Sequence, residues 1–532
     1  MKEGKSIKFA RIAMFVILFC VIVLPLVRML FNLNGDAFKK VFGGDNFLPA
    51  LGNTLASGLL ATMVSLIIAY ALAWAINRTG ILGKEIFAII LVMPMLIPSI
   101  SHGLGLIILF GNNGIITNLL KMDASIYGFG GVVIGSVLYS FPVAFLMISD
   151  IFKYQDYSPY EAAKVLGISK PRQFMSISLP YMRKPLVSAF FAVFTMIVTD
   201  YGVPLSVGGH YKTLPVLLYE QAVGQLNYST GSVIGLLLLF PAVAAFLFDL
   251  FNQDKGNSHY VTKPFEIEKN TVRDVAAYVI CAVVTLFTLS VIFSFCVQAF
   301  AKRYPTDMSF TFDNFVKTFN KDGGEFLINS IIMSVLTAGL GTVVAFVTAY
   351  MTARTKGKLS KVLHLMSITS LAIPGLVLGL SYVIVFKKSF FYGTLIILIM
   401  VNMVHFFASP YLMMYNAFGK MNENLEDVGG ILGVSRIRMI WDVIVPQSKY
   451  TIIEMFSYFF VNCMMTISAV SFLATPDNKP LSLLINQFET FNMMECAAVV
   501  AILIFVVNVA VKAVVNILKR IGERKHANEK TV

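Results

Sequence analysis

The sequence predicts an all-α polytopic membrane protein with about twelve transmembrane helices, arranged as two homologous halves of six helices each. Of its 532 residues, 57% are hydrophobic and only 13% are charged, whereas a soluble domain carries about 25% charged residues. Apolar runs of about 20 residues, long enough to cross a bilayer, recur along the whole chain. The second half also repeats the residue pattern of the first.

The candidate spans are spread over the whole chain. They lie near residues 11–31, 53–77, 85–111, 130–150, 184–206, 231–251, 273–297, 329–352, 361–386, 391–414, 451–474 and 494–518. The first span follows a cluster of Lys and Arg residues, as the apolar part of a secretory signal peptide would. Its apolar run is too long for such a peptide and lacks a cleavage site of small residues, so we interpret it as an uncleaved anchor.

Basic residues predict the orientation of the chain. An even number of spans places both termini on one side, and most of the 42 Lys and Arg residues lie in the loops of that side, which the positive-inside rule assigns to the cytoplasm. Lipid headgroups then account for the net charge of +13, and no nucleic-acid partner is expected. The five cysteines lie in apolar runs without CxxC spacing, so neither a disulfide framework nor a metal site is expected.

The middle of the chain predicts a domain boundary. The polar stretch 252–272 is interpreted as a linker between a first transmembrane domain, 1–251, and a second, 273–532. Each domain contains one long cytoplasmic loop, 151–183 in the first and 415–450 in the second.

An internal repeat supports this division. Residues 53–79 read NTLASGLLATMVSLIIAYALAWAINRT and residues 329–355 read NSIIMSVLTAGLGTVVAFVTAYMTART, so each stretch opens with Asn and closes with Arg-Thr. Pro98 and Pro374, each after an Ile, occupy matching positions, and we expect each to kink its span, either at a gate or as a tolerated kink. Two repeats of six spans share one membrane topology and are related by an axis along the membrane normal.

Both long loops carry one motif. Residues 161–180 read EAAKVLGISKPRQFMSISLP and residues 427–446 read DVGGILGVSRIRMIWDVIVP. In the first copy the acid favours a helix start, and Gly167 can adopt the positive φ that turns the chain. A second short helix is expected from about Ser169 to Ser178, and Pro180 is expected to stop it. Two short helices at an angle form a knob that fits a groove in another protein.

The motif resembles the EAA loop of bacterial ABC-importer permeases of type I. The matching residues are Glu161, Ala162, Ala163, Gly167, Ile177, Leu179 and Pro180. In that family the loop docks on the ATPase subunit, which implies that Glu161 contacts a basic group there. The second copy keeps Asp427, Gly433 and Pro446 but has Val428 and Gly429 in place of the two alanines, so it binds its ATPase either differently or more weakly.

The resemblance also implies partners. The chain has no G-x-x-x-x-G-K-[ST] phosphate loop, so it is expected to be no enzyme and to bind no cofactor. ATP and Mg²⁺ would be used by a separate ATPase, present in two copies. Substrate would arrive on an extracytoplasmic solute-binding protein. The protein would then be a multi-pass component of the bacterial inner membrane with both termini in the cytoplasm.

A transport path is suggested by polar residues late in the fifth span. Asp200 is an acid within an apolar stretch, and it either caps a helix end or faces the pore together with Tyr201. The matching stretch of the second half, near Ser468, lacks the acid. His405 is interpreted as a buried histidine bonding a neighbouring helix. The expected path therefore includes Asp200, Tyr201, Pro98, Pro374 and Ser468.

The stretch 199–251 carries a hint about the solute. It is similar to fused permeases for 2-aminoethylphosphonate and, less closely, for iron(III), and its Asp-Tyr-Gly core is shared by thiamine permeases; a thiamine or polyamine permease is a further alternative. The rival class is an ion-coupled secondary transporter, which would need several acids or broken helices at mid-membrane.

Overall fold

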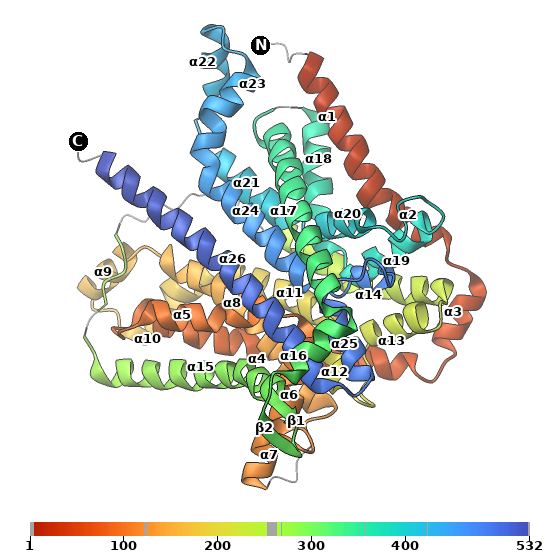
Figure 1. Cartoon of the computed structure of the whole chain (residues 1–532). Coiled ribbons are helices and arrows are strands. Elements are labelled where there is room, and N and C mark those ends of the chain that lie inside the picture. Colours follow the sequence, from red (N-terminus) through yellow and green to blue (C-terminus); the bar gives the residue numbers. More distant parts are fainter. Residues whose placement is uncertain are drawn as a thin grey trace.

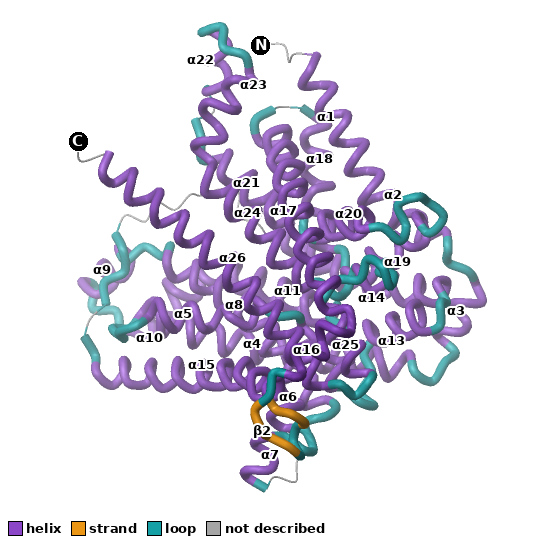
Figure 2. Tube along the Cα trace, viewed as in Figure 1, coloured by secondary structure: helices purple, strands orange, loops and turns teal. Residues whose placement is uncertain are grey.

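The structure is a computed structural model, almost entirely helical, and it describes residues 5–121, 125–252, 263–267, 269–355, 357–422 and 424–529 (Figures 1 and 2). The first half comprises α1 (Lys5–Leu18), η1 (Phe19–Val23), α2 (Leu24–Phe31), α3 (Gly35–Phe42), α4 (Phe47–Arg78), α5 (Lys84–Val92), η2 (Met93–Leu96), α6 (Ser99–Phe110), α7 (Ile115–Leu120), α8 (Phe129–Lys153), α9 (Ser158–Val165), α10 (Lys170–Gln173), η3 (Phe174–Ser178), α11 (Leu179–Val198), α12 (Gly202–Val207), α13 (Leu214–Tyr219), η4 (Glu220–Gly224) and α14 (Tyr228–Asn252). The second half comprises α15 (Thr271–Phe300), β1 (Ala301–Arg303), β2 (Asp307–Phe310), α16 (Asp313–Thr318), η5 (Phe319–Gly323), α17 (Gly324–Ala353), α18 (Lys358–Thr369), η6 (Ser370–Ala372), α19 (Gly375–Phe386), α20 (Leu395–His405), α21 (Ala408–Gly419), α22 (Leu425–Ile431), α23 (Arg436–Met439), η7 (Ile440–Ile444), α24 (Val445–Met465), η8 (Val470–Phe472), α25 (Ser482–Thr490) and α26 (Met494–Glu529). Strands β1 and β2 form a small antiparallel hairpin.

Each predicted span corresponds to a helix or to a broken helix. Within the described residues, 9 helices are long and apolar enough to cross a membrane, and the number rises to 11 if each of two bent pairs is one span. The remaining predicted span, 451–474, corresponds to α24, which ends at Met465 and carries Lys449 and Glu454 near its start. The chain is therefore an all-α polytopic membrane protein, but several of its spans are less regular than predicted.

The spans 85–111 and 361–386 are interrupted at Pro98 and Pro374, where kinks were predicted, and the interruptions are complete breaks of the helix. Helix α6 starts directly after Pro98 and α19 directly after Pro374, and in the second half α18–η6 and α19 meet at an angle of 110°. A proline cannot donate the backbone hydrogen bond that would join the two segments, and its ring disfavours a helical residue before it. Matching residues thus have the same effect in both halves.

The other interruptions lie near the middle of the bundle. The predicted span 184–206 divides into α11, which ends at Val198, and α12, which begins at Gly202. The predicted span 391–414 divides into α20 and α21, bent by 52°. Breaks of this kind leave backbone groups free to bond side chains instead of continuing a helix.

The loop motifs fold as two short helices, with one correction. Gly167 and Gly433 have φ of 68° and 70°, so each turns the chain as predicted. Pro180, however, does not stop the second helix, because α10, the π-turn η3 and α11 run on without a gap from Lys170 to Val198. The wider π-turn accommodates a proline that lacks its N–H, and η7 occupies the same place before Pro446.

The two halves interlock through their first helices. The α1–η1–α2 helix packs on α18 and α19 of the second half, where the Tyr382 hydroxyl donates to the carbonyl of Val21 (2.7 Å). Helix α15 in turn packs on α4, α5 and α6 of the first half, and the Asp274 carboxylate accepts from the backbone N–H of Gly80 (3.1 Å). One large apolar core therefore includes residues of both halves, and a second core lies within the first half and α15.

The short helices of the two loops lie at the periphery of the molecule (Figure 1). In Figure 1, α9–α10 and α22–α23 project at separate ends of the molecule. Of the predicted linker 252–272, residues 253–262 and 268 lie outside the described residues. The described piece 263–267 lies against the first loop.

Candidate functional site

The first loop presents apolar side chains to solvent around its acid. Ala163 is the buried contact of α9, whereas Val165 and Leu166 are 88% and 74% exposed and Phe174 and Met175 are also exposed. Of the other residues predicted from the motif, Ala162, Leu179 and Pro180 are exposed, and Glu161 and Ile177 are half-buried. Exposed apolar side chains gathered on one knob mark an interaction surface.

The second loop presents the matching surface. Ile431 and Leu432, the counterparts of the exposed pair in the first loop, are 84% and 72% exposed, and Trp441 is exposed beside them. Asp427 is exposed at the position of Glu161. The divergent second motif therefore keeps the shape, the acid and the apolar pair of the first.

An arginine fixes each loop to the repeated helix before it. In the first half, Arg78 ends α4 and donates to the carbonyl of Phe152 (2.8 Å) and to Oε1 of Gln155 (2.7 Å). Gln155 donates to the hydroxyl of Tyr160 (2.6 Å), which also bonds Ser178 in η3 (2.6 Å). This chain of hydrogen bonds joins α4, the end of α8 and both helices of the loop.

The second half uses a direct ion pair. Arg354, at the end of α17, donates to both carboxylate oxygens of Glu426 at 2.8 and 2.5 Å, and to the carbonyl of Asn422 at 2.7 Å. The side chains of Arg354 and Glu426 are only 5% and 8% exposed. Glu426 directly precedes Asp427, just as Tyr160 directly precedes Glu161, so the arginine reaches this position directly in the second half and through Gln155 in the first.

Neither arginine is among the residues predicted to form the site. A signal was present, because both repeated stretches close with Arg-Thr. Thr79 and Thr355 each bond a backbone carbonyl of the preceding turn, which leaves the arginines at the helix ends.

The halves meet where the fifth spans break. Tyr201 is buried, and its hydroxyl bonds the carbonyl of Ile467 (3.2 Å) and the hydroxyl of Ser471 (2.7 Å) of the second half. Its ring stacks on Tyr219 at 4.9 Å. The predicted path residue Tyr201 is thus a contact across the junction of the halves.

The other predicted path residues surround this junction. Pro98 and Pro374 directly precede α6 and α19, whose first residues are Ser99 and Gly375. Ser99 lies so close to Gly202 that a Cβ added to this glycine would meet it. In the second half, a Cβ added to Gly375 would meet Ser468 and His405. The predicted hydrogen bond of His405 to a neighbouring helix is not seen for Nδ1, which has no partner among the described residues.

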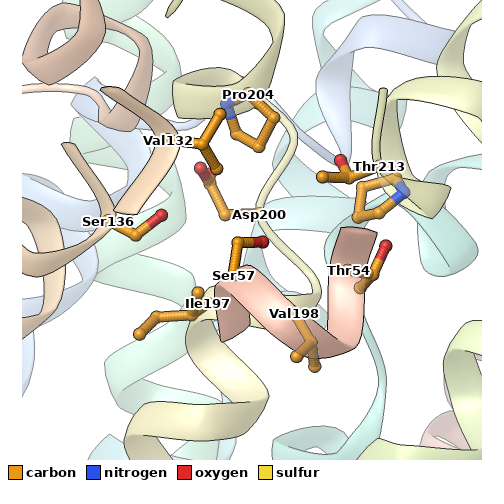
Figure 3. Close-up of a pocket in the computed structure, with 10 residues that line it drawn as sticks. Thr54, Ser57, Val132, Ser136, Ile197, Val198, Asp200, Pro204 and Thr213 are labelled. Atoms are coloured by element: carbon orange, nitrogen blue, oxygen red, sulfur yellow. The ribbon is translucent and has the colours of Figure 1, made fainter. Parts of the chain in front are cut away.

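Asp200 caps a helix and also lines a cavity. Its Oδ2 accepts from the backbone N–H of Val203 (3.0 Å), at the start of α12. It borders a small, partly open cavity (Figure 3). The residues that line this cavity are Thr54, Ser57, Val132, Ser136, Ile197, Val198, Asp200, Pro204, Thr213 and Pro215. The capping interpretation of Asp200 is confirmed, and its role in a path stays a prediction.

Charged residues nearer the helix ends are paired. Glu454 bonds Lys519, and Asp150 lies 3.6 Å from Lys153. The five cysteines are free. Within the described part of the chain no group of three or more His, Cys, Asp or Glu residues is placed to hold a metal ion.

The chain matches one family model twice. Residues 65–305 and 339–521 match the family described as "Binding-protein-dependent transport system inner membrane component". Each match covers most of one half, and the pair together covers both loops.

Among curated proteins, the chain is similar to two from bacteria over nearly its whole length. It is 26% identical to the "Ferric transport system permease protein FbpB" of Actinobacillus pleuropneumoniae, over 90% of this chain and 73% of that protein. It is 25% identical to the "Putative ferric transport system permease protein FbpB 1" of Haemophilus influenzae, over 90% of this chain and 80% of that protein.

Other relatives correspond to half of the chain. The "Molybdate/tungstate transport system permease protein WtpB" of Methanocaldococcus jannaschii is 29% identical over 45% of this chain and 95% of its own length. Among solved structures, a bacterial alginate ABC transporter in complex with an alginate pentasaccharide-bound periplasmic protein matches with a TM-score of 0.39 and 17% identity, over 48% of this chain and 96% of that chain.

Proposed function

The chain belongs to the family of binding-protein-dependent transport system inner membrane components, and from this premise we propose that it is the permease of an ABC importer for iron(III). Two copies of a separate ATPase would drive it, one on each loop, and an extracytoplasmic binding protein would deliver the substrate. The observation that carries the proposal is the pair of matching loops, each with an exposed apolar pair beside an acid and each fixed by an arginine to a membrane helix.

The helices offer a mechanical connection from loop to junction. The helix Lys170–Val198 begins in the first loop and ends three residues before Tyr201. Its 29 residues span about 43 Å at 1.5 Å per residue. A shift of the loop, imposed by the nucleotide cycle of a docked ATPase, would move the far end of this helix relative to Ile467. We infer that the hydrogen bonds of Tyr201 open and close with that shift.

Iron(III) is the solute best supported, because two relatives that each match 90% of the chain are named as ferric transport permeases, one of them as "putative". A second candidate is 2-aminoethylphosphonate, favoured by the resemblance of the stretch 199–251 to permeases for that solute. In either case the binding protein would select the solute, and the permease would contribute the passage between its halves.

The test is reconstituted transport. The chain, its ATPase and its binding protein are placed in liposomes, and uptake of radiolabelled iron(III) or 2-aminoethylphosphonate is followed with and without ATP. We expect ATP-dependent uptake of iron(III), and Glu161→Lys should abolish it while the protein still inserts. Uptake driven by a proton gradient without any ATPase would refute the ABC mechanism, and uptake of 2-aminoethylphosphonate alone would refute the solute.

A further inference from the structure

A described piece of the mid-chain stretch packs on the first loop. This piece, residues 263–267, is called the strap below. The backbone N–H of Tyr157 donates to the carbonyl of Lys263 (3.1 Å), and the N–H of Lys263 donates to Oδ1 of Asp156 (3.1 Å). These two hydrogen bonds of the Lys263 backbone, one to the backbone of Tyr157 and one to the side chain of Asp156, hold the strap beside the start of α9.

The side chain of Lys263 reaches the acid of the motif. Its ammonium bonds Oε1 of Glu161 and lies 3.1 Å from Oε1 of Glu266 within the strap. These hydrogen bonds raise the pKa of Lys263 above its ordinary value, so the lysine stays charged at neutral pH. The side chains of Lys263 and Glu161 are 36% and 43% exposed, so another protein can reach both.

Phe265 anchors the strap between aromatic residues and the arginine of the first half. Its ring centre lies 3.7 Å from the guanidinium carbon of Arg78. Edge-to-face contacts join it to Tyr157 (4.8 Å) and Tyr160 (5.3 Å). Cation–π and aromatic contacts of this kind add to apolar burial, so the strap has a built seat on the loop.

The acid of the second loop has no such cover in the described part of the chain. Among the residues that the structure describes, no lysine or arginine forms an ion pair with Asp427, the counterpart of Glu161. The two loops therefore present the same acid in different states, one neutralised by the chain's own lysine and one open.

We propose that the strap is an intramolecular competitor for the ATPase at the first loop: Lys263 occupies Glu161 and is displaced when the ATPase docks. The inference rests on the proposed function, in which Glu161 bonds a basic group of the ATPase. Because the strap is part of the same chain, it faces Glu161 at high effective concentration. Because the ion pair is solvent-exposed, it is weak enough for a partner to displace.

The experiment measures the affinity of the full-length chain in lipid nanodiscs for the purified ATPase subunit that assembles with it. We expect Lys263→Gln to tighten binding about two- to five-fold, the range that an exposed ion pair allows. Lys269→Gln is the matched control, because this nearby lysine lies outside the strap, and it should leave the affinity unchanged. Equal or weaker binding by K263Q would overturn the proposal.

A disulfide provides a second measurement that does not alter Glu161 or Lys263. Tyr157→Cys and Phe265→Cys are introduced together in a chain whose five native cysteines are replaced. Oxidation should hold the strap on the loop and weaken ATPase binding, and reduction should restore it. An affinity that does not respond to oxidation of the formed disulfide would overturn the proposal.

Glu161→Lys separates this inference from the proposed function. If E161K leaves ATPase affinity unchanged, docking at the first loop is wrong and the strap proposal fails with it. If E161K weakens binding but K263Q does not tighten it, the loop docks as proposed and only the strap proposal is wrong.

Discussion

The buried pair Arg354–Glu426 should determine the stability of the second loop. Arg354→Ala removes hydrogen bonds to Glu426 and to the carbonyl of Asn422 and leaves a carboxylate that is 8% exposed without its cation. Breaking a buried ion pair by removing one member costs about 3–5 kcal/mol. Local opening of the loop should then become about a hundredfold more frequent, or more.

The matched control is the same substitution in the first half. Arg78→Ala leaves the amide of Gln155 and the backbone carbonyl of Phe152 without a donor, but it leaves no buried charge unpaired. Its cost should therefore be smaller, about 1.5–3 kcal/mol for hydrogen bonds from a charged donor. Arg78→Ala also removes the cation–π contact with Phe265, so a cost that is still smaller than that of Arg354→Ala points to the unpaired charge of Glu426.

The assay is amide hydrogen exchange on the full-length protein in nanodiscs, read on peptides from residues 424–436. We expect R354A to lose protection there, and R354A combined with Glu426→Ala to lose less than the sum of the two single variants, since no unpaired charge remains. If the effects of R354A and E426A simply add, or if R354A exchanges like the unmodified chain, the ion pair does not hold the loop.

Two further results are expected. Tyr201→Phe removes hydrogen bonds across the junction to Ile467 and Ser471 and should destabilise the protein by about 1–2 kcal/mol in thermal unfolding. Tyr219→Phe is the control, because it removes a single 3.3 Å bond and should cost less. Equal effects would contradict a stabilising role of the Tyr201 hydroxyl at the junction. Burial raises the pKa of Glu489, in α25, from its ordinary value of 4.5 to about 7, so the folded chain binds the proton more tightly. Its contribution to stability is complete below pH 4.5 and is lost as the pH rises to about 7, so the melting temperature should fall over that interval and Glu489→Gln should flatten the fall.

The features that could be predicted from the sequence are those with a local cause. Gly167 turns the loop because it can adopt positive φ, and the span breaks at Pro374 because proline lacks an N–H. Hydropathy located the helices that are long and apolar enough to cross a membrane, and the repeat showed that the halves share one architecture.

The remaining features depend on contacts between distant residues. Pro180 was expected to end a helix by the ordinary rule, and the rule failed because a π-turn before it supplies the extra room. Phe265 packs on Arg78, and α15 packs on helices of the first half. In both cases the contact joins segments that are distant in the sequence, and the residue pattern of neither segment indicates the other as its partner. Single-sequence periodicity reports which face of a helix is apolar, but it does not report which partner covers that face.

The exchange of first helices has a consequence for how such a chain can evolve. Because α1–α2 covers the second half and α15 covers the first, a half on its own would expose the surfaces that its opposite number normally shields. Two separate half-length chains could cover these surfaces by forming a dimer. A homodimer would then need one sequence that suits both halves, and a heterodimer would need each chain to bind one specific partner. Joining the halves in a single polypeptide fixes which half pairs with which, so the sequence of each repeat can diverge independently. The arginine at the end of the repeated helix bonds a glutamine in the first half and a glutamate in the second, which is a difference of this kind.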